Sequence, residues 1–240
     1  MSEVAPKEAT LVGERVPYEV RRSSEATQPR IDVDINGVLV VIPSDASLDP
    51  ETLLRENAAW VVEKKQKFDR FRERIPDREF VPGEMFPFQG EPHEVVVEQR
   101  PASEVVDGEL RLAKHHVEDT SIQRALETLY RRKARDWFEE QANRLAQEMD
   151  VKYEKIEVRN QRTKWGSCST TGTLGLNWRL LMAPPEVAKY VVIHELAHLR
   201  EQNHTDEFWS FVEEHDPQYE EHNRWLKENS VQLVFTPDDL

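Results

Sequence analysis

Residues 194–204 contain the side chains whose types and spacing could do chemistry, and they read His-Glu-Leu-Ala-His-Leu-Arg-Glu-Gln-Asn-His. His194 and His198 are four positions apart, so on a helix both imidazoles lie on one face and can reach one ion. His204 can supply a third ligand. Three protein ligands leave one position of a tetrahedral zinc ion open to water, as catalytic sites require.

Glu195 directly follows the first histidine and completes the pattern His-Glu-x-x-His. In this pattern two histidines bind zinc and the glutamate is the general base of a metalloprotease. The predicted reaction is hydrolysis of a peptide bond by a zinc-bound water, with Glu195 moving the proton to the leaving amine. The alternative is an exposed helix that carries two histidines and no metal.

A buried helix over about residues 185–203 is predicted to position these groups. Pro184 and Pro185 suit a helix start. The following stretch, 187–197, is apolar almost all round, which is typical of a buried helix. Asn203 is the expected C-cap, after which the chain can bring His204 back toward the metal. A bound metal would satisfy the buried imidazoles.

Motifs over 162–209 resemble the YgjP-like metallopeptidases, relatives of the SprT-like and WLM zinc peptidases. The motifs are Thr163–Ser169, Leu176–Leu181, Pro184–Tyr190, the stretch from His194 to Leu199, Asn203–Thr205 and Phe208-Trp209. The resemblance covers about residues 15–228. It implies a zincin-like peptidase with His194, His198 and His204 as zinc ligands and Glu195 as catalytic base. Metzincins carry Gly where this chain has Glu201, so the resemblance to metzincins proper is weaker.

The expected fold class is α+β, with a small β-rich N-terminal module followed by a zincin-like metallopeptidase domain that contains the His-Glu-x-x-His helix. The predicted boundaries are a disordered tail at 1–14, the β-rich module at 15–115, the metallopeptidase domain at 116–228 and an acidic tail at 229–240.

Strands are expected at 16–22, 31–35, 38–42, 94–99, 109–113, 156–158 and 174–177. One helix is expected from Asp49 to about Phe71, and another of about 28 residues after a capping box at Thr120–Gln123. No internal repeat is evident. The strand Leu174–Asn177 is predicted to be the edge that binds an extended substrate.

Composition narrows the possible partners. The 240 residues include 46 acidic and 32 basic residues, for a net charge of −14. Such a surface disfavours non-specific binding to nucleic acid or anionic membranes and suits a high-salt cytoplasm, so we take a halophilic source as a hypothesis. The expected partner is a protein or peptide substrate. The basic run Arg131–Arg135 keeps a DNA-associated protease or adaptor open as an alternative, and a binding module stabilised by zinc is another.

The expected location is the cytoplasm. Cys168 is the single cysteine, which excludes an intrachain disulfide and fits a reducing compartment. The N-terminus lacks the basic and apolar regions of a secretory signal, and no apolar run of about 18 residues could span a membrane.

Other residues have weaker assignments. The Trp165–Cys168 loop either lines the substrate cleft or packs beneath the predicted helix. Three histidines already fill the zinc site, so Cys168 is not expected to be a ligand. Four residues are alternatives for the donor to the oxyanion: Arg162, Tyr190, His215 and Tyr219. We expect three further histidines to take no part in metal binding: His115, His116 and His222. Phe208-Trp209 are expected in the core.

Overall fold

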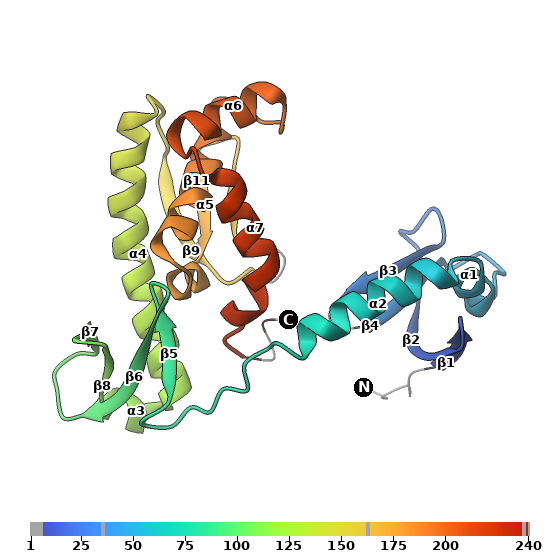
Figure 1. Cartoon of the computed structure of the whole chain (residues 1–240), viewed down its shortest axis with the longest axis horizontal. Helices are drawn as coiled ribbons and strands as arrows, with labels where there is room; N and C mark the ends of the chain where they lie inside the picture. Colours follow the sequence, from blue (N-terminus) through green and yellow to red (C-terminus); the bar gives the residue numbers. More distant parts are fainter. Residues whose placement is uncertain (1–6, 35–36, 162–163, 237–238, 240) are drawn as a thin grey trace. The chain divides into compact units, whose positions relative to one another are not determined.

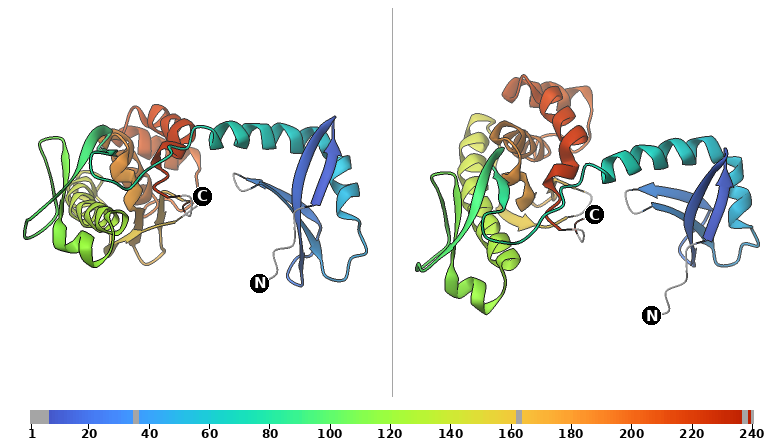
Figure 2. Two further views of the ribbon diagram at one scale, coloured as in Figure 1. Left: turned by 90° about the horizontal axis from the view of Figure 1, so that it is seen from below. Right: turned by 60° about the horizontal axis from the view of Figure 1, so that its bottom comes forward.

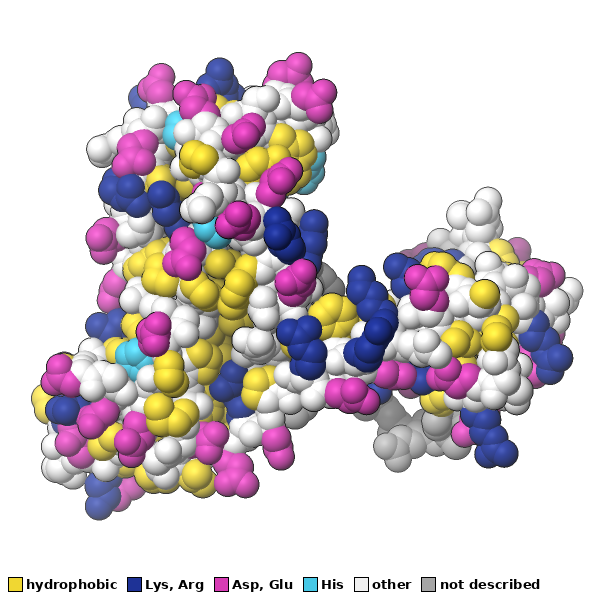
Figure 3. Space-filling view, in the orientation of Figure 1, with side chains coloured by type: hydrophobic (Ala, Val, Ile, Leu, Met, Phe, Trp, Pro, Cys, Tyr) yellow, Lys and Arg dark blue, Asp and Glu magenta, His cyan; other side chains and the backbone are white. Residues whose placement is uncertain are grey.

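The computed structural model describes residues 7–34, 37–161, 164–236 and 239 (Figure 1). The chain forms two compact units, which divide between Ile75 and Pro76. Acidic and basic side chains are interspersed over the face shown in Figure 3. None of the helices in the described part of the chain has both the length and the apolar character that a membrane crossing needs.

The first unit is a four-stranded sheet with two helices. Its strands are β1 (Lys7–Leu11), β2 (Glu14–Ser23), β3 (Arg30–Asp34) and β4 (Gly37–Pro43), in the order β1-β2-β4-β3. The helices are α1 (Pro50–Glu56) and α2 (Ala58–Arg72). Asp49 caps α1 as expected, because its carboxylate accepts a hydrogen bond from the Thr52 amide. The core of this unit includes Val16, Val40 and Leu54.

The second unit begins with another four-stranded sheet and a long helix. Its first strands are β5 (Met85–Phe88), β6 (Glu91–Glu98), β7 (Glu104–Val106) and β8 (Glu109–Ala113), in the order β5-β6-β8-β7. Helices α3 (Lys114–Asp119) and α4 (Ile122–Glu148) follow. The cap of α4 is Ser121, whose hydroxyl accepts from the Arg124 amide, rather than the expected capping box at Thr120.

The remainder of the second unit is a small sheet covered by helices. Its elements are β9 (Lys155–Arg159), β10 (Gly166–Cys168), β11 (Thr173–Asn177), the 3-10 helix η1 (Trp178–Met182), α5 (Pro185–Ala197), α6 (Asp206–His215), α7 (Tyr219–Asn229) and the 3-10 helix η2 (Ser230–Leu233). Helix α5 packs between α4 and α7 (Figure 1). Both faces of α5 are therefore covered, which explains its apolar sequence.

The division of the chain differs from the predicted boundary at 115/116. Strands β5–β8 lie against the N-terminal part of α4 (Figure 2). Their inward side chains, Phe86, Val95, Leu110 and Leu112, are in the same core as those of α4 and α5. The alternating pattern identified these strands but did not say which helix would cover them.

Both predicted tails contain ordered, buried residues. Ala9 and Leu11 of β1 are buried in the core of the first unit. At the other end, Leu233 and Phe235 are buried in the core of the second unit. In both segments a few apolar residues stand among charged ones, so composition alone predicted tails where the fold supplies a partner surface.

The two four-stranded sheets share one topology, a repeat that the sequence did not reveal. In each sheet the first two strands are antiparallel, the second and fourth are parallel, and the last two are antiparallel. The first hairpins also turn alike, at Val12-Gly13 and Gln89-Gly90, where all four residues have positive φ. The shared feature is therefore strand pairing and turn geometry rather than a recurring run of residues.

A buried ion pair anchors the C-terminal segment. One Asp239 carboxylate oxygen lies 3.6 Å from Arg179 Nη1, and both side chains are buried. The same carboxylate accepts hydrogen bonds from Asn160 Nδ2 and the Thr236 amide. Arg179 in turn donates to the Gln161 carbonyl oxygen. The segment that follows η2 is thereby joined to the loop before β10.

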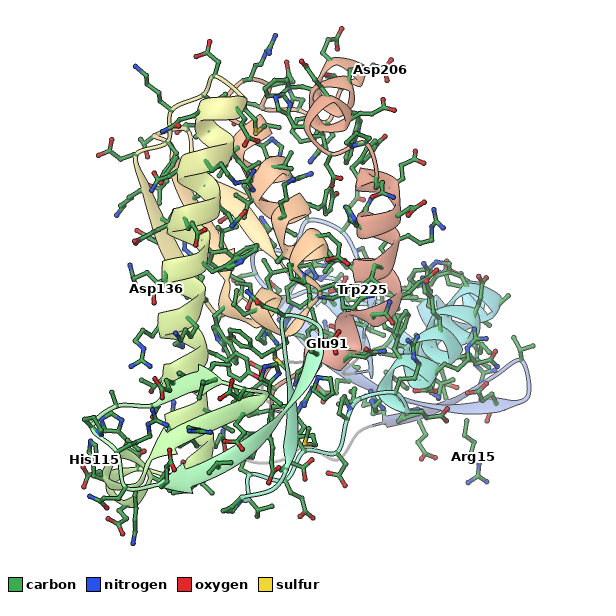
Figure 4. The ribbon with its side chains drawn as sticks, turned by 60° about the vertical axis from the view of Figure 1, so that its left-hand side comes forward. Arg15, Glu91, His115, Asp136, Asp206 and Trp225 are labelled. Carbon is green, nitrogen blue, oxygen red and sulfur yellow. The ribbon has the colours of Figure 1, made fainter. Side chains whose placement is uncertain are left out.

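We expect Asp239→Ala to lower the free energy of unfolding by about 3 kcal/mol, because it leaves the buried Arg179 guanidinium without its counter-charge. Urea unfolding of the full chain measures this. The matched control is Asp136→Ala on the exposed face of α4 (Figure 4), which should change stability by no more than about 0.5 kcal/mol. Equal losses in both variants would contradict the role given to the pair.

Candidate metal centre

Three histidines converge at the end of α5. His194 lies in the last turn of the helix, and His198 is its C-cap. The helix ends earlier than the expected cap at Asn203, because the Leu199 and Arg200 amides bond three residues back, to Leu196 and Ala197. This tight turn reverses the chain and brings His204 next to the other two imidazoles.

The distances between these imidazoles fit a single metal ion. The three ligand nitrogens lie within 4.8 Å of one another. His194 Nε2 and His204 Nε2 are 3.1 Å apart. Two nitrogens bound to one tetrahedral zinc ion at about 2.0–2.1 Å are separated by about 3.3 Å. The donor set, three imidazoles, is also one that zinc accepts.

Neighbouring groups hold the imidazoles in place. The Phe208 ring lies 5.0 Å from that of His194 and 4.7 Å from that of His198, and the Trp209 ring stacks on His204. His198 Nδ1 lies 3.2 Å from the Glu201 carbonyl oxygen, which leaves its Nε2 free to bind a metal. His194 Nδ1 is buried without a hydrogen-bond partner among the described residues.

Burial keeps the central histidine neutral. Burial lowers the pKa of His194 to about 3, with smaller contributions from His198 and His204. The pKa of His198 is also lowered, mainly by burial. Both rings therefore offer lone pairs rather than protons at neutral pH, which is the form that binds a metal.

The Glu195 carboxyl lies beside this cluster and directly under strand β10. A Cβ atom on Gly166 would come within 2.4 Å of Glu195 Oε1. The strand can therefore cross the carboxyl only because residue 166 has no side chain. Burial raises the pKa of Glu195 to about 8, and the charge of Lys164 acts in the opposite direction. A carboxyl with a pKa this close to neutral pH is suited to exchange a proton with a neighbouring group.

A pocket of about 380 Å³ opens next to His194 and Glu195. Its walls come from the loop before β10, from α5 and from α7, and include Lys164, Trp165, Tyr190, Val191, Leu226 and Lys227. The pocket therefore joins the reactive groups to a space that can hold part of a substrate. Trp165 lines this space. Lining the substrate cleft was one of the two alternatives that the sequence left open for the Trp165–Cys168 loop.

Tyr190 is the oxyanion-donor candidate that lines this pocket. Burial raises its pKa to about 12, so the phenol keeps its proton. Tyr219 instead stacks on Trp209, and His215 Nδ1 lies 2.9 Å from the Phe211 carbonyl oxygen. Arg162 lies outside the described residues.

The edge strand near Glu195 is β10 and not, as predicted, Leu174–Asn177. That segment forms β11, which pairs with β10 on one side and β9 on the other. Its backbone hydrogen bonds are used within the sheet, so it cannot add a substrate strand. Strand β10, a three-residue strand, is at the edge of the described sheet. Alternation alone did not separate a central strand from an edge.

Among the described residues, the cluster that could hold a metal contains the three histidines and none of the other residues with weaker assignments. Burial raises the pKa of Cys168 to about 11, so the thiol is protonated at neutral pH. His115 lies at the opposite end of the second unit from Asp206, the first residue of α6, which follows His204 by two positions (Figure 4). His222, expected at the surface, is largely buried and lies 2.8 Å from Asp216 Oδ2. Its burial comes from packing of α7, which the sequence pattern did not show.

Comparison with known proteins identifies the family. The model of the YgjP-like metallopeptidase domain matches residues 27–229. The chain belongs to the YgjP-like family. Membership of this metallopeptidase family implies a metal-dependent peptidase. No curated protein matches the chain.

Two solved structures resemble part of this YgjP-like chain. The metallopeptidase zymogen abylysin of Pyrococcus abyssi is 24% identical, with a TM-score of 0.36, over 40% of this chain and 99% of its own. The zymogen jannalysin of Methanocaldococcus jannaschii is 21% identical, with a TM-score of 0.36, over 39% of this chain and 96% of its own. Both match less than half of the chain, so the family assignment rests on the family model.

We expect the protein to take up about one zinc ion per chain, and His194→Ala to remove that binding, because it deletes the central ligand. Mass spectrometry of the purified protein and zinc titration with a competing chelator measure both. His115→Ala removes a histidine at the far end of the unit and should leave uptake unchanged. Equal uptake by both variants would place the metal elsewhere.

We expect Gly166→Ala to reduce peptide hydrolysis by about a hundredfold while zinc uptake persists, since the new methyl group displaces the Glu195 carboxyl by an ångström or more. Ser167→Ala changes the next residue of β10 without crowding Glu195 and serves as the control. Unchanged hydrolysis by the Gly166 variant would show that the contact between β10 and Glu195 does not matter for catalysis.

Proposed function

We propose that this YgjP-like protein is a zinc-dependent peptidase, with His194, His198 and His204 as zinc ligands and Glu195 as the general base. The observation that carries the proposal is the convergence of three imidazole nitrogens within 4.8 Å beside the buried Glu195 carboxyl. A zinc ion held only for stability would not need this carboxyl, whose burial is costly. The bound zinc would act as a Lewis acid on water and on the scissile carbonyl.

We assign proton transfer, substrate alignment and stabilisation of the oxyanion to groups around the proposed metal site. Glu195 accepts the proton of the attacking water and returns it to the leaving amine, which its raised pKa favours. The edge of β10 aligns the substrate backbone by adding it as a strand next to the Glu195 carboxyl. Tyr190 keeps its proton and is the donor that we assign to the oxygen of the scissile carbonyl.

The charges on α4 do not favour a role on DNA. Within the basic run, Arg131 Nε lies 2.8 Å from Glu127 Oε1, and Arg135 Nη1 lies 3.9 Å from Glu139 Oε1. Arg132 donates to the Ser103 carbonyl oxygen. These contacts are those of a solvated helix face with neighbouring carboxylates, and they weaken the field that phosphate binding needs. A protein or peptide remains the proposed substrate.

We expect Glu195→Gln to keep the zinc ion and to cleave an unstructured casein-like substrate at least about a thousandfold more slowly, because it removes the proton acceptor. Glu186→Gln in the first turn of α5, which is exposed, should cleave like wild type. Zinc content and cleavage rate are measured on the same preparations.

Chelation provides a second test of the proposal. Removal of zinc should abolish cleavage while the circular dichroism spectrum and the unfolding transition stay close to those of the loaded protein. Loss of the fold on chelation would instead indicate a structural zinc site.

A further inference from the structure

The pocket beside Glu195 is lined by more basic than acidic side chains, whereas the chain as a whole is acidic. The chain has 46 acidic and 32 basic residues. Among the lining residues that the structure describes, however, two are lysines, Lys164 and Lys227, and Glu195 is the sole acid. Glu195 already has a role in the proposed reaction. The pocket is therefore cationic within an acidic protein.

The two lysines come from separate elements that are fixed on either side of the pocket. Lys164 lies in the loop before β10. Asn177 Nδ2 donates to the carbonyl oxygens of Gln161 and Lys164, at 2.8 and 3.3 Å, and holds this loop against the end of β11. Lys227 lies on α7, which packs on α5. The two positions are therefore set by the fold.

Neither ammonium group forms an ion pair with a carboxylate within the described part of the chain, and the charge of Lys164 also acts on the Glu195 carboxyl. The apolar part of the pocket lining is formed by Trp165, Val191 and Leu226, and Tyr190, Asn223 and Ser230 add polar groups. An apolar wall with cations at the rim suits an aliphatic group that ends in a carboxylate.

A second hollow continues the same charge pattern along α7. It has a volume of about 410 Å³, shares Asn223 and Lys227 with the first, and adds Arg224. Glu220 is its acidic residue. A substrate that crosses this surface next to the metal would meet more positive than negative side chains.

We propose that Lys164 and Lys227 select substrates with a carboxylate on the residue next to the scissile bond. This inference rests on the proposed peptidase function and adds the class of substrate to it. The carboxylate belongs either to an Asp or Glu side chain or to the free C-terminus of a short peptide. The apolar walls hold the carbon chain in both cases, and the two ammonium groups supply the charge contacts.

Matched peptides test this selection on the zinc-loaded full chain. One arm compares amidated peptides that differ only by Glu or Gln on either side of the cleaved bond. The other compares a Gln peptide that ends one residue after that bond as a free acid or as an amide. We expect wild type to favour the carboxylate by about five- to tenfold in kcat/KM in one arm, as expected from two exposed charge pairs. That arm identifies the source of the carboxylate.

Substitutions then assign the preference to the two lysines. Lys164→Gln combined with Lys227→Gln should bring the ratio close to one, and glutamate at both positions should make Lys the preferred residue over Glu. Lys152→Gln, the same charge change at an exposed lysine outside this pocket, should keep the wild-type ratio. A wild-type ratio near one in both arms, or an unchanged ratio in the double variant, would overturn the inference.

Binding separates this inference from the proposed activity. Calorimetry with Glu195→Gln measures the affinity for the same peptides without cleavage, and the carboxylate peptides should bind about five- to tenfold more tightly. If wild type cleaved no peptide while this preference was present, the peptidase proposal would fail and the pocket assignment would stand. Cleavage of all peptides at equal rates, with equal affinities, would support the peptidase and refute the pocket assignment.

Discussion

Burial of polar groups in a helix that is otherwise apolar is the constraint on which the site depends. Helix α5 is covered by α4 and α7, so His194 is half-buried beside the pocket and Glu195 is buried. Desolvation lowers the pKa of the first and raises that of the second. The same burial therefore prepares the imidazole to bind a metal and the carboxyl to accept a proton. Both groups would be costly to bury without such partners.

Close approach of the small sheet to this helix places a sheet edge next to the Glu195 carboxyl. Strand β10 passes over Glu195 at Gly166, and any side chain there would occupy the space of the carboxyl. Since β10 is also the edge of the described sheet, the proposed substrate strand would lie next to the proposed proton acceptor through one packing contact. Arg179 and Asp239 stabilise the loop before β10, because they join it to the C-terminal segment that follows η2.

The two four-stranded sheets have the same topology but pack against different elements. In the second unit the sheet packs on the long helix α4 and shares its core with α5, the helix that carries His194 and Glu195. In the first unit a sheet of the same topology forms a small core of its own with α1 and α2. The repeat is carried by strand pairing and by left-handed turns at Val12-Gly13 and Gln89-Gly90, which few residue types adopt. Corresponding strands of the two sheets have different residues, which hides the repeat in the sequence.

The sequence by itself determined the parts of this protein that depend on local spacing. The four-residue spacing of His194 and His198 on a helix, the neighbouring Glu195 and the Asp49 cap are properties of helix geometry, and residue order specifies them. The family was also identifiable from motif order, and the α+β class from hydrophobic periodicity. The metal ligands and the base themselves stay predictions until zinc binding and cleavage are measured.

Only the tertiary structure decided what depends on contacts between distant segments. It placed the unit boundary at Ile75 rather than at 115, because the faces of β5–β8 are covered by α4. It made β10 rather than β11 the sheet edge, and it buried Val231 and residues 233–235 of the segment that composition had marked as a tail. It also brought Lys164 and Lys227 to one pocket. Periodicity tells which side of an element is apolar, but the partner of that side is set by packing across the whole chain.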